Sequence, residues 1–206
     1  MMKFYYAPGT ISVAVAYALE DTGVDYAPVA LDFKAGQQTS AEYLAINPKA
    51  RVPALVSDAG ILTETGAILE YLASLVPDRA LVPDDPWQAA QMRSAMFYLA
   101  STVHVNHAHK HRGSRWATRQ DLFDDMTAKV PETMAASCRF IEDNWALSPY
   151  VMGERMSMAD PYLYSVCTWL AGDGVDITAF PKLAAFFTMM SNRPAAAAIR
   201  EKGIAL

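Results

Sequence analysis

The chain has 206 residues, of which 52% are hydrophobic and 19% charged, so it can bury one large or two small cores. Its formal net charge of −5 argues against nucleic acid as a partner, because phosphate binding depends on clustered lysine and arginine. It lacks an apolar run of the roughly 18 residues a membrane span needs, a signal-peptide segment and a disulfide framework, so we expect a soluble cytoplasmic protein with no membrane partner.

The first third of the chain alternates strand and helix patterns. The expected elements are a strand over 3–7, a helix over 12–22, a strand over 26–31, a helix over 40–44, strands over 54–56 and 61–63, and a helix from 64 or 65 to 72. Gly23 ends the first helix, and Pro28 favours an edge position for the second strand. The crossover between the first two strands should be right-handed and make them parallel.

The stretch from Ile46 to Leu69 carries the strongest functional pattern. Pro53 precedes a strand, where a missing N–H is tolerated, and the Val52–Pro53 bond is a candidate cis peptide. Glu64 or Thr65 begins the next helix, where unpaired backbone N–H groups attract a carboxylate. Backbone beside a cis-proline and a helix start can together hold an extended peptide.

The composition changes after residue 76. Prolines and acidic residues crowd residues 77–86 and predict a linker. From residue 87 only helical patterns follow, over 88–109, 121–145 with an interruption near Pro131, 157–170, 181–191 and 194–202. Ser157 and Asp160 have the spacing of a capping box at the start of one of these helices.

These motifs resemble those of a known family. Val52-Pro53 and Glu64-Thr65 resemble the glutathione-binding half of cytosolic glutathione transferases, and Ser157 to Asp160 resembles a capping box of their sixth helix. The opening Tyr-Tyr-Ala-Pro-Gly is most similar to the bacterial beta class. The resemblance implies an α/β thioredoxin-like domain over 1–76, a linker over 77–86 and an all-α domain over 87–206.

The resemblance also implies a function. The expected activity is conjugation of the thiolate of glutathione, a co-substrate, to a small hydrophobic electrophile, in a detoxification role and without a metal. A homodimer is implied as well, and Gln88, Gln91, Met92 and Ala95 offer a mixed surface for it. A non-catalytic glutathione- or protein-binding member of the fold is the alternative, because a fold does not fix a function.

The turn before the first helix departs from the beta-class pattern. That class places a cysteine followed by a serine here, whereas this chain has Ile11 followed by Ser12. A thiol–disulfide oxidoreductase is disfavoured, because no cysteine lies near this helix and Cys138 and Cys167 fall in apolar helical windows. Ser12, at the expected N-cap, is the favoured donor to a bound thiolate. The hydroxyl groups of Thr10, Tyr5 and Tyr6 are alternative donors.

All four histidines lie between residues 104 and 111. His104, His107 and His111 share one helical face, which could serve a metal, but the nearby cations Lys110, Arg112 and Arg115 favour a basic wall facing an anion. By resemblance to the beta class, His104 and then Ser101 face glutathione.

The remaining binding residues follow from the peptide-like binding mode. Val52 should pair its backbone with the cysteinyl unit, while Glu64 and Thr65 hold the γ-glutamyl end. The resemblance further implies that Lys34 or Lys49 supplies a cation for the glycine carboxylate.

Overall fold

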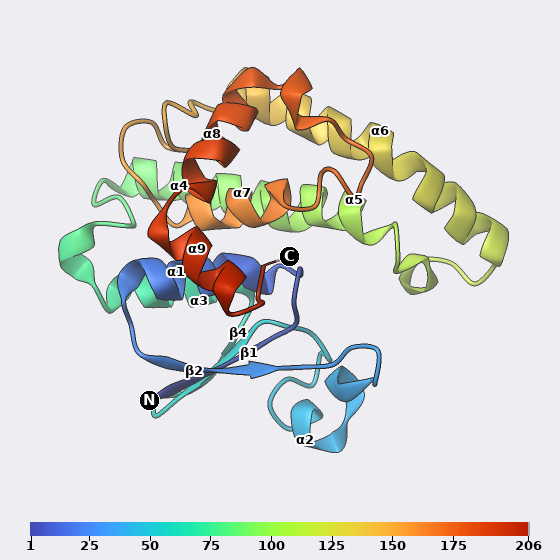
Figure 1. The fold of residues 1–206 in the computed structure, drawn as a ribbon, viewed down its shortest axis with the longest axis horizontal. Coiled ribbons are helices and arrows are strands. Elements are labelled where there is room, and N and C mark those ends of the chain that lie inside the picture. The colour runs from blue at the N-terminus through green and yellow to red at the C-terminus, as the bar shows by residue number, and fades with distance from the viewer. Residues whose placement is uncertain (206) are drawn as a thin grey trace.

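A four-stranded sheet forms one layer of the computed structural model, which describes residues 1–205 (Figure 1). The strands are β1 (Met2–Tyr6), β2 (Tyr26–Ala30), β3 (Ala54–Ser57) and β4 (Gly60–Thr63), in the order β2-β1-β3-β4. β1 runs parallel to β2, as predicted for the crossover between them, and antiparallel to β3. Pro28 lies on β2 at the edge of the sheet, where its missing N–H breaks no ladder.

Three helices accompany the sheet: α1 (Ser12–Thr22), α2 (Ala41–Leu44) and α3 (Thr65–Ser74), with a 3-10 turn at Gln37–Thr39. Gly23 ends α1 in the left-handed conformation, and its N–H donates to the Leu19 carbonyl. Ser40 caps α2 by accepting from the Tyr43 N–H at 3.2 Å. α1 and α3 lie between the sheet and the helices of the second half (Figure 1).

The second half is helical throughout its described part. Its elements are α4 (Pro86–Tyr98), a π-helical segment (Leu99–Val103), α5 (His104–Ala108), α6 (Gln120–Asn144), α7 (Ala159–Cys167), α8 (Pro181–Ser191) and α9 (Pro194–Glu201), with 3-10 turns at Pro77–Arg79, Gly113–Arg115 and Ile177–Ala179. α4, the π-helical segment and α5 continue one another, and we call residues 86–108 the α4–α5 rod. The expected break near Pro131 is wrong, because α6 continues through it. One face of α6, including Val130 and Met134, is buried in the core, and this packing outweighs the cost of a helical proline.

One continuous hydrophobic core joins the two halves. Residues 12–19 of α1 are all buried, and α1 packs against α7 and α9 as well as α3. Within residues 1–205, no helix is both long and apolar enough to cross a membrane.

The start of α7 is held by a buried carboxylate. Asp160 accepts hydrogen bonds from the backbone N–H groups of Val151 (2.8 Å) and Ser157 (2.6 Å). The acidic half of the expected capping box is therefore formed. Its other half is not, because the Ser157 hydroxyl donates to Asp160 at 3.0 Å instead of accepting from an N–H.

Candidate active site

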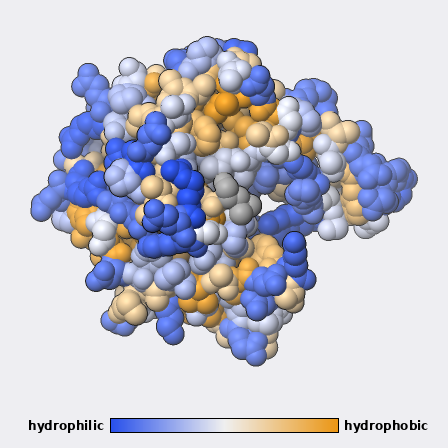
Figure 2. Space-filling view, viewed as in Figure 1, coloured by the Kyte–Doolittle hydropathy of each residue, from blue (hydrophilic) through white to orange (hydrophobic). Residues whose placement is uncertain are grey.

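A cleft of about 670 Å³ lies between the sheet half of the molecule and the α4–α5 rod. This volume is within the range of small-molecule sites. Figure 2 shows the surface hollowed between the α2 side of the sheet and α5, with hydrophilic residues around the opening. The lining residues are Ile11, Asn47, Arg51, Val52, Pro53, Glu64, Thr65, Gly66, Ala67, Glu70, Arg93, Met96, Phe97, Ala100, His104 and Tyr162.

The Val52–Pro53 segment gives the cleft a free backbone edge. The Val52–Pro53 bond is cis, as predicted. Neither the N–H nor the carbonyl of Val52 has a hydrogen-bond partner among residues 1–205. The preceding loop is fixed because the Arg51 carbonyl accepts from the Tyr43 hydroxyl and the Asn47 amide, both at 2.6 Å. An extended peptide can therefore pair with Val52.

The start of α3 supplies an anion site beside that edge. The backbone N–H groups of Thr65, Gly66 and Ala67 have no partner within the described chain, as at any uncapped helix start. Thr65 is only 6% exposed, yet its side chain lines the cleft. Glu64 precedes it at a positive φ of 75°, and Lys49 pairs with the Glu64 carboxylate. Together these groups can hold a carboxylate and an amine.

The structure corrects the predicted arrangement at the start of α1. Ile11, not Ser12, is the N-cap, and Ser12 is fully buried and does not line the cleft. The Thr10 hydroxyl donates to the Ala7 carbonyl at 2.8 Å, and its oxygen lies 3.0 Å from Ser12 Oγ. The N–H of Ile11 has no acceptor among residues 1–205, and Ile11 is the residue of this turn that lines the cleft.

The turn itself is tied to the second half of the chain. The Trp169 indole N–H donates to the Gly9 carbonyl at 3.0 Å, and the Gly9 N–H donates to the Ile204 carbonyl at 3.0 Å. Gly9 is thus bonded on both sides, which fixes the position of Ile11.

His104 lies on the opposite wall of the cleft, on the α4–α5 rod with Phe97 and Ala100. Burial, and then the neighbouring charges of His107 and Arg112, lower the pKa of His104 to about 4. The ring is therefore neutral at neutral pH, and the expected positive wall does not include it. A neutral imidazole can still donate one hydrogen bond.

The other histidines form no metal cluster. His107 Nδ1 lies 2.7 Å from the Asp173 carboxylate, and the His107 ring stacks on Trp169. His109 packs edge-on against Trp116. Among residues 1–205 no three His, Cys, Asp or Glu side chains are grouped as a metal would require.

Of the predicted site residues, the cleft brings together five: Val52, Pro53, Glu64, Thr65 and His104. It does not include Ser12, Thr10, Tyr6, Lys34, Lys49 or Ser101.

Each of the other predicted residues has a different local role. Tyr6 stacks on Phe4 in the core. The backbone N–H of Lys34 donates to Asp32 in an exposed loop. Ser101 donates to the Phe97 carbonyl.

Several residues that line the cleft were not predicted from the sequence. Arg51 precedes Val52 directly, so its place within the strongest pattern was a usable signal. Arg93 binds Glu70 through two 2.8 Å hydrogen bonds, and Tyr162 comes from α7. Nothing local in the sequence marks these last residues, because they meet only when the two halves pack.

A thioredoxin-like sheet half, an all-helical half and a cleft beside a cis-proline define the two-domain class to which glutathione transferases belong. The N-terminal domain of glutathione S-transferases matches residues 1–74, and their C-terminal domain matches residues 120–194. The chain is 30% identical over 196 residues to glutathione S-transferase GstA of Escherichia coli O157:H7, covering 94% of each chain. The chain therefore belongs to the glutathione S-transferase family, as its motifs predicted, and is an enzyme of that family.

Solved structures agree with this assignment. A glutathione transferase homologue from Sulfitobacter, solved with bound glutathione, is 57% identical with a TM-score of 0.96 over 99% of both chains. The beta-class glutathione S-transferase of Sphingomonas chungbukensis is 27% identical, with a TM-score of 0.85 over 98% of both chains. The chain is also 30% identical to a maleylacetoacetate isomerase of Pseudomonas aeruginosa, covering 94% of this chain and 93% of that one.

Proposed function

We propose that this protein binds glutathione in the cleft and transfers its thiolate sulfur to a small electrophile. The observation that carries the proposal is the set of unpaired groups around one cleft: the Val52 backbone, the N–H groups at the start of α3, and the N–H of Ile11, a residue that lines the cleft together with His104. Bound glutathione in the 57% identical Sulfitobacter protein supports it.

The unpaired groups give glutathione a direction. The γ-glutamyl carboxylate fits the N–H groups of Gly66 and Ala67 and the hydroxyl of Thr65, and its ammonium fits Glu64. The cysteinyl backbone then pairs with Val52. The glycine end points toward Arg51.

The thiol is activated without a protein cysteine. A free thiol has a pKa of ~8.5, so little thiolate exists at neutral pH. The N-terminus of α1 lowers that pKa through its dipole and the free N–H of Ile11, and neutral His104 adds a hydrogen-bond donor from the rod. Met96, Phe97 and Ala100 provide the apolar wall against which the electrophile lies.

The protein acts as a homodimer in this proposal. Met92 and Ala95, expected at the dimer surface, are buried in the core and cannot serve it. An exposed stripe on α4 takes their place, with Trp87 71% and Phe97 70% exposed and Ala90 and Ser94 between them. Positions spaced three and four residues apart share one helical face, as a helix-packing surface requires.

The domain limits and the location remain part of the proposal. The units are 1–76 and 87–206, joined by 77–86, although α4 already begins at Pro86. The cytoplasm is the expected compartment, because the two cysteines, Cys138 and Cys167, are free and buried and form no disulfide. Two inert core thiols of this kind suit a reducing environment.

A second candidate activity is glutathione-dependent isomerisation. The 30% identity to the Pseudomonas aeruginosa maleylacetoacetate isomerase favours it, and the same thiolate would act as a transient nucleophile that is regained.

A turnover assay separates these activities from simple binding. The purified protein is mixed with glutathione and chlorodinitrobenzene, and thioether formation is followed by absorbance. Turnover above the uncatalysed rate, abolished by a competing S-alkyl glutathione, is the expected result. Tight glutathione binding by calorimetry with no turnover of this or an isomerase substrate would instead establish the non-catalytic binding protein.

A further inference from the structure

Three side chains pack together next to His104, and we call Trp169, His107 and Asp173 the Trp169 cluster. His107 is on the α4–α5 rod, whereas Trp169 and Asp173 follow α7. The Asp173 side chain is 1% exposed and Trp169 is 6% exposed, so both lie in the interior. None of the three lines the cleft. Any effect of the cluster on a ligand in the cleft therefore passes through other residues.

A buried carboxylate sets the orientation of the His107 ring. His107 Nδ1 lies 2.7 Å from Asp173 Oδ2, and Lys110 Nζ lies 3.4 Å from Asp173 Oδ1. An ionised carboxylate only accepts hydrogen bonds, so Nδ1 carries the proton and is the donor. This hydrogen bond fixes both the tautomer and the plane of the ring.

The oriented His107 ring supports Trp169. The two rings are stacked, with their centroids 4.2 Å apart and their planes at 16°. The His104 ring also lies against Trp169, with centroids 5.1 Å apart and planes at 51°. Aromatic rings at such separations attract one another beyond the area they bury. Trp169 therefore joins His107 to His104, which lines the cleft.

The indole N–H of Trp169 holds the turn that leads into α1. It donates to the Gly9 carbonyl at 3.0 Å. Gly9 has a positive φ of 66°, and Ile11, two residues later, is the N-cap of α1 and lines the cleft. One tryptophan thus contacts both sides of the proposed sulfur site, the turn that carries the Ile11 N–H and the His104 ring.

The surroundings of Asp173 differ from those of other buried carboxylates. Asp160 accepts from backbone N–H groups before α7, and Glu142 accepts from two at the start of α8. The Asp173 carboxylate instead contacts the side chains of His107 and Lys110, which belong to another part of the fold. A buried ion pair adds little stability over apolar packing. The placing of the His107 ring is what the Asp173 carboxylate achieves.

We propose that His107 and Asp173 are positioning residues of the sulfur site, which act through Trp169 to hold the Ile11 turn and His104 in place. This inference rests on the proposed function, since it concerns the same thiolate. A shift of about 1 Å in a group that contacts the reacting atom is enough to lower a rate strongly, so residues outside the cleft can control activation.

The first measurement follows Trp169 itself and does not depend on glutathione. Nuclear magnetic resonance of protein with isotope-labelled tryptophan resolves the indole N–H groups, and the signal missing from Trp169→Phe identifies that of Trp169. In His107→Ala this N–H should exchange with solvent about tenfold faster, because the ring that supports it is gone. Asp173→Ala should behave in the same way. Asp173→Asn keeps an acceptor for His107 and should exchange like the wild type.

The second measurement is the pKa of the thiol of bound glutathione, followed by the ultraviolet absorbance of the thiolate. His107→Ala should raise this pKa by about half a unit and lower kcat for chlorodinitrobenzene about threefold. The dissociation constant of glutathione should change by less than about twofold, because Val52 and Thr65 bind it from the sheet half. A loss of kcat with unchanged affinity is the result expected of a positioning residue.

A double-mutant cycle tests whether His107 acts through Trp169. Trp169→Phe keeps a ring for the stack but removes the donor to Gly9, so it should by itself raise the pKa of the bound thiol. Adding His107→Ala to Trp169→Phe should raise it much less than His107→Ala does in the wild type. Two increases that simply add show that His107 acts independently of Trp169, and they overturn the inference.

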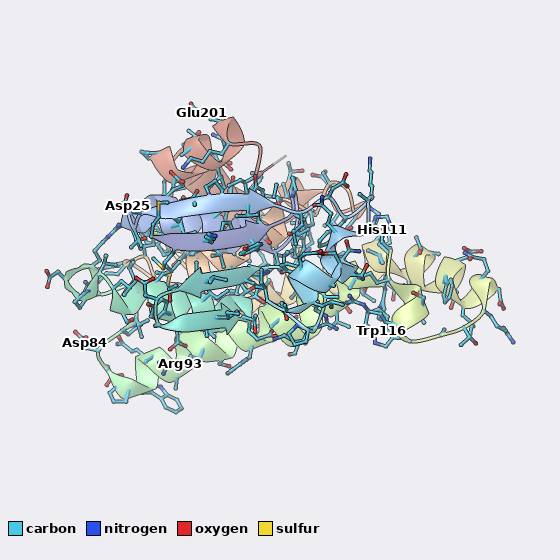
Figure 3. All side chains as sticks on the ribbon, turned by 90° about the horizontal axis from the view of Figure 1, so that it is seen from below. Asp25, Asp84, Arg93, His111, Trp116 and Glu201 are labelled. Carbon is cyan, nitrogen blue, oxygen red and sulfur yellow. The ribbon has the colours of Figure 1, made fainter. Side chains whose placement is uncertain are left out.

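Two controls remove comparable groups elsewhere. His109 packs on Trp116, which Figure 3 shows at the end of the rod away from Arg93, so His109→Ala should leave both measurements unchanged. Glu142 is buried and accepts two 3.0 Å hydrogen bonds at the start of α8, so Glu142→Gln should lower stability and change neither measurement. Circular dichroism and thermal melting show that each variant is folded. Controls that change both measurements as far as His107→Ala overturn the inference, because loss of stability would then explain its effect.

The two measurements separate this inference from the proposed function. A wild-type protein that lowers the thiol pKa, with the same value in His107→Ala and Asp173→Ala, overturns the inference and leaves the transferase standing. A wild-type protein that does not lower the thiol pKa overturns the proposed activation. In that case faster indole exchange in His107→Ala still establishes that His107 holds Trp169 and the turn, and unchanged exchange overturns the inference as well.

Discussion

Thr65 is the side chain with which glutathione recognition is most directly tested. Its hydroxyl lines the cleft beside free backbone N–H groups and has no partner within residues 1–205. Thr65→Ala removes one hydrogen bond to a charged ligand group, so we expect glutathione to bind about fivefold more weakly in calorimetry. Thr39→Ala, in an exposed turn of the same half, should bind like the wild type. Equal affinity for all three proteins would exclude Thr65 from the site.

His104 is expected to act as a neutral hydrogen-bond donor. Because its pKa is about 4, its charge does not change between about pH 5.5 and pH 8.5. His104→Ala should lower kcat/KM for chlorodinitrobenzene about tenfold, by the same factor at every pH in this range. His109→Ala, against Trp116 and away from the cleft, should have no effect. A ratio of wild-type to variant rate that rises as the pH falls through 6.5 would show that the imidazolium is the active form.

At the scale of single elements, local sequence was a reliable guide to the first half. Gly23, Ser40 and Pro28 mark a helix end, a helix start and an edge strand, and each does so by a short-range mechanism. Pro131 was misleading because the local signal for a helix break competes with burial of a 25-residue helix against the core. The prediction placed Ser12 at the N-cap of α1, whereas the N-cap is Ile11, one residue earlier. Ser12 is therefore inside the helix, and its hydroxyl is buried in the interior and not exposed to the cleft.

The loop before α7 is held to that helix by Asp160. Both carboxylate oxygens accept from buried groups, Oδ1 from the Val151 N–H and Oδ2 from the N–H and hydroxyl of Ser157. Asp160→Asn turns one acceptor into a donor and leaves a buried N–H unpaired, so it should lower the free energy of unfolding by about 1–3 kcal/mol. Urea unfolding at neutral pH measures this. Asp143→Asn, exposed on α6, should unfold like the wild type, and equal stability of both variants would contradict the role of Asp160.

For the whole molecule, what the sequence reveals depends on how far apart the cooperating residues lie. Val52, Pro53, Glu64 and Thr65 were predictable because they lie in one continuous stretch that forms a wall by itself. Arg93 and Tyr162 meet that wall only after the rod and α7 pack on the sheet half. No periodicity or spacing encodes these long-range contacts, so the sequence predicted the wall formed by Val52 to Thr65, whereas on the opposite wall it predicted His104 alone, by resemblance.

The assembly of the molecule can be tested through the exposed stripe on α4. Trp87 is 71% exposed at the start of α4, and such an aromatic on a helical face with Phe97 is typical of a surface that packs against a partner. We expect sedimentation equilibrium to give twice the 22.6 kDa chain mass at micromolar concentration. Trp87→Glu places a charge at the N-terminal end of this stripe and should shift the mass to that of one chain.

Trp116 provides the matched control, because it is 47% exposed but lies beyond α5, away from the stripe. Trp116→Glu should remain a dimer. Glutathione affinity should be the same for both variants, because neither tryptophan lines the cleft, and this separates loss of assembly from loss of fold. A wild-type mass of 22.6 kDa would exclude the dimer, and a Trp87→Glu variant of unchanged dimer mass would place the interface on another face.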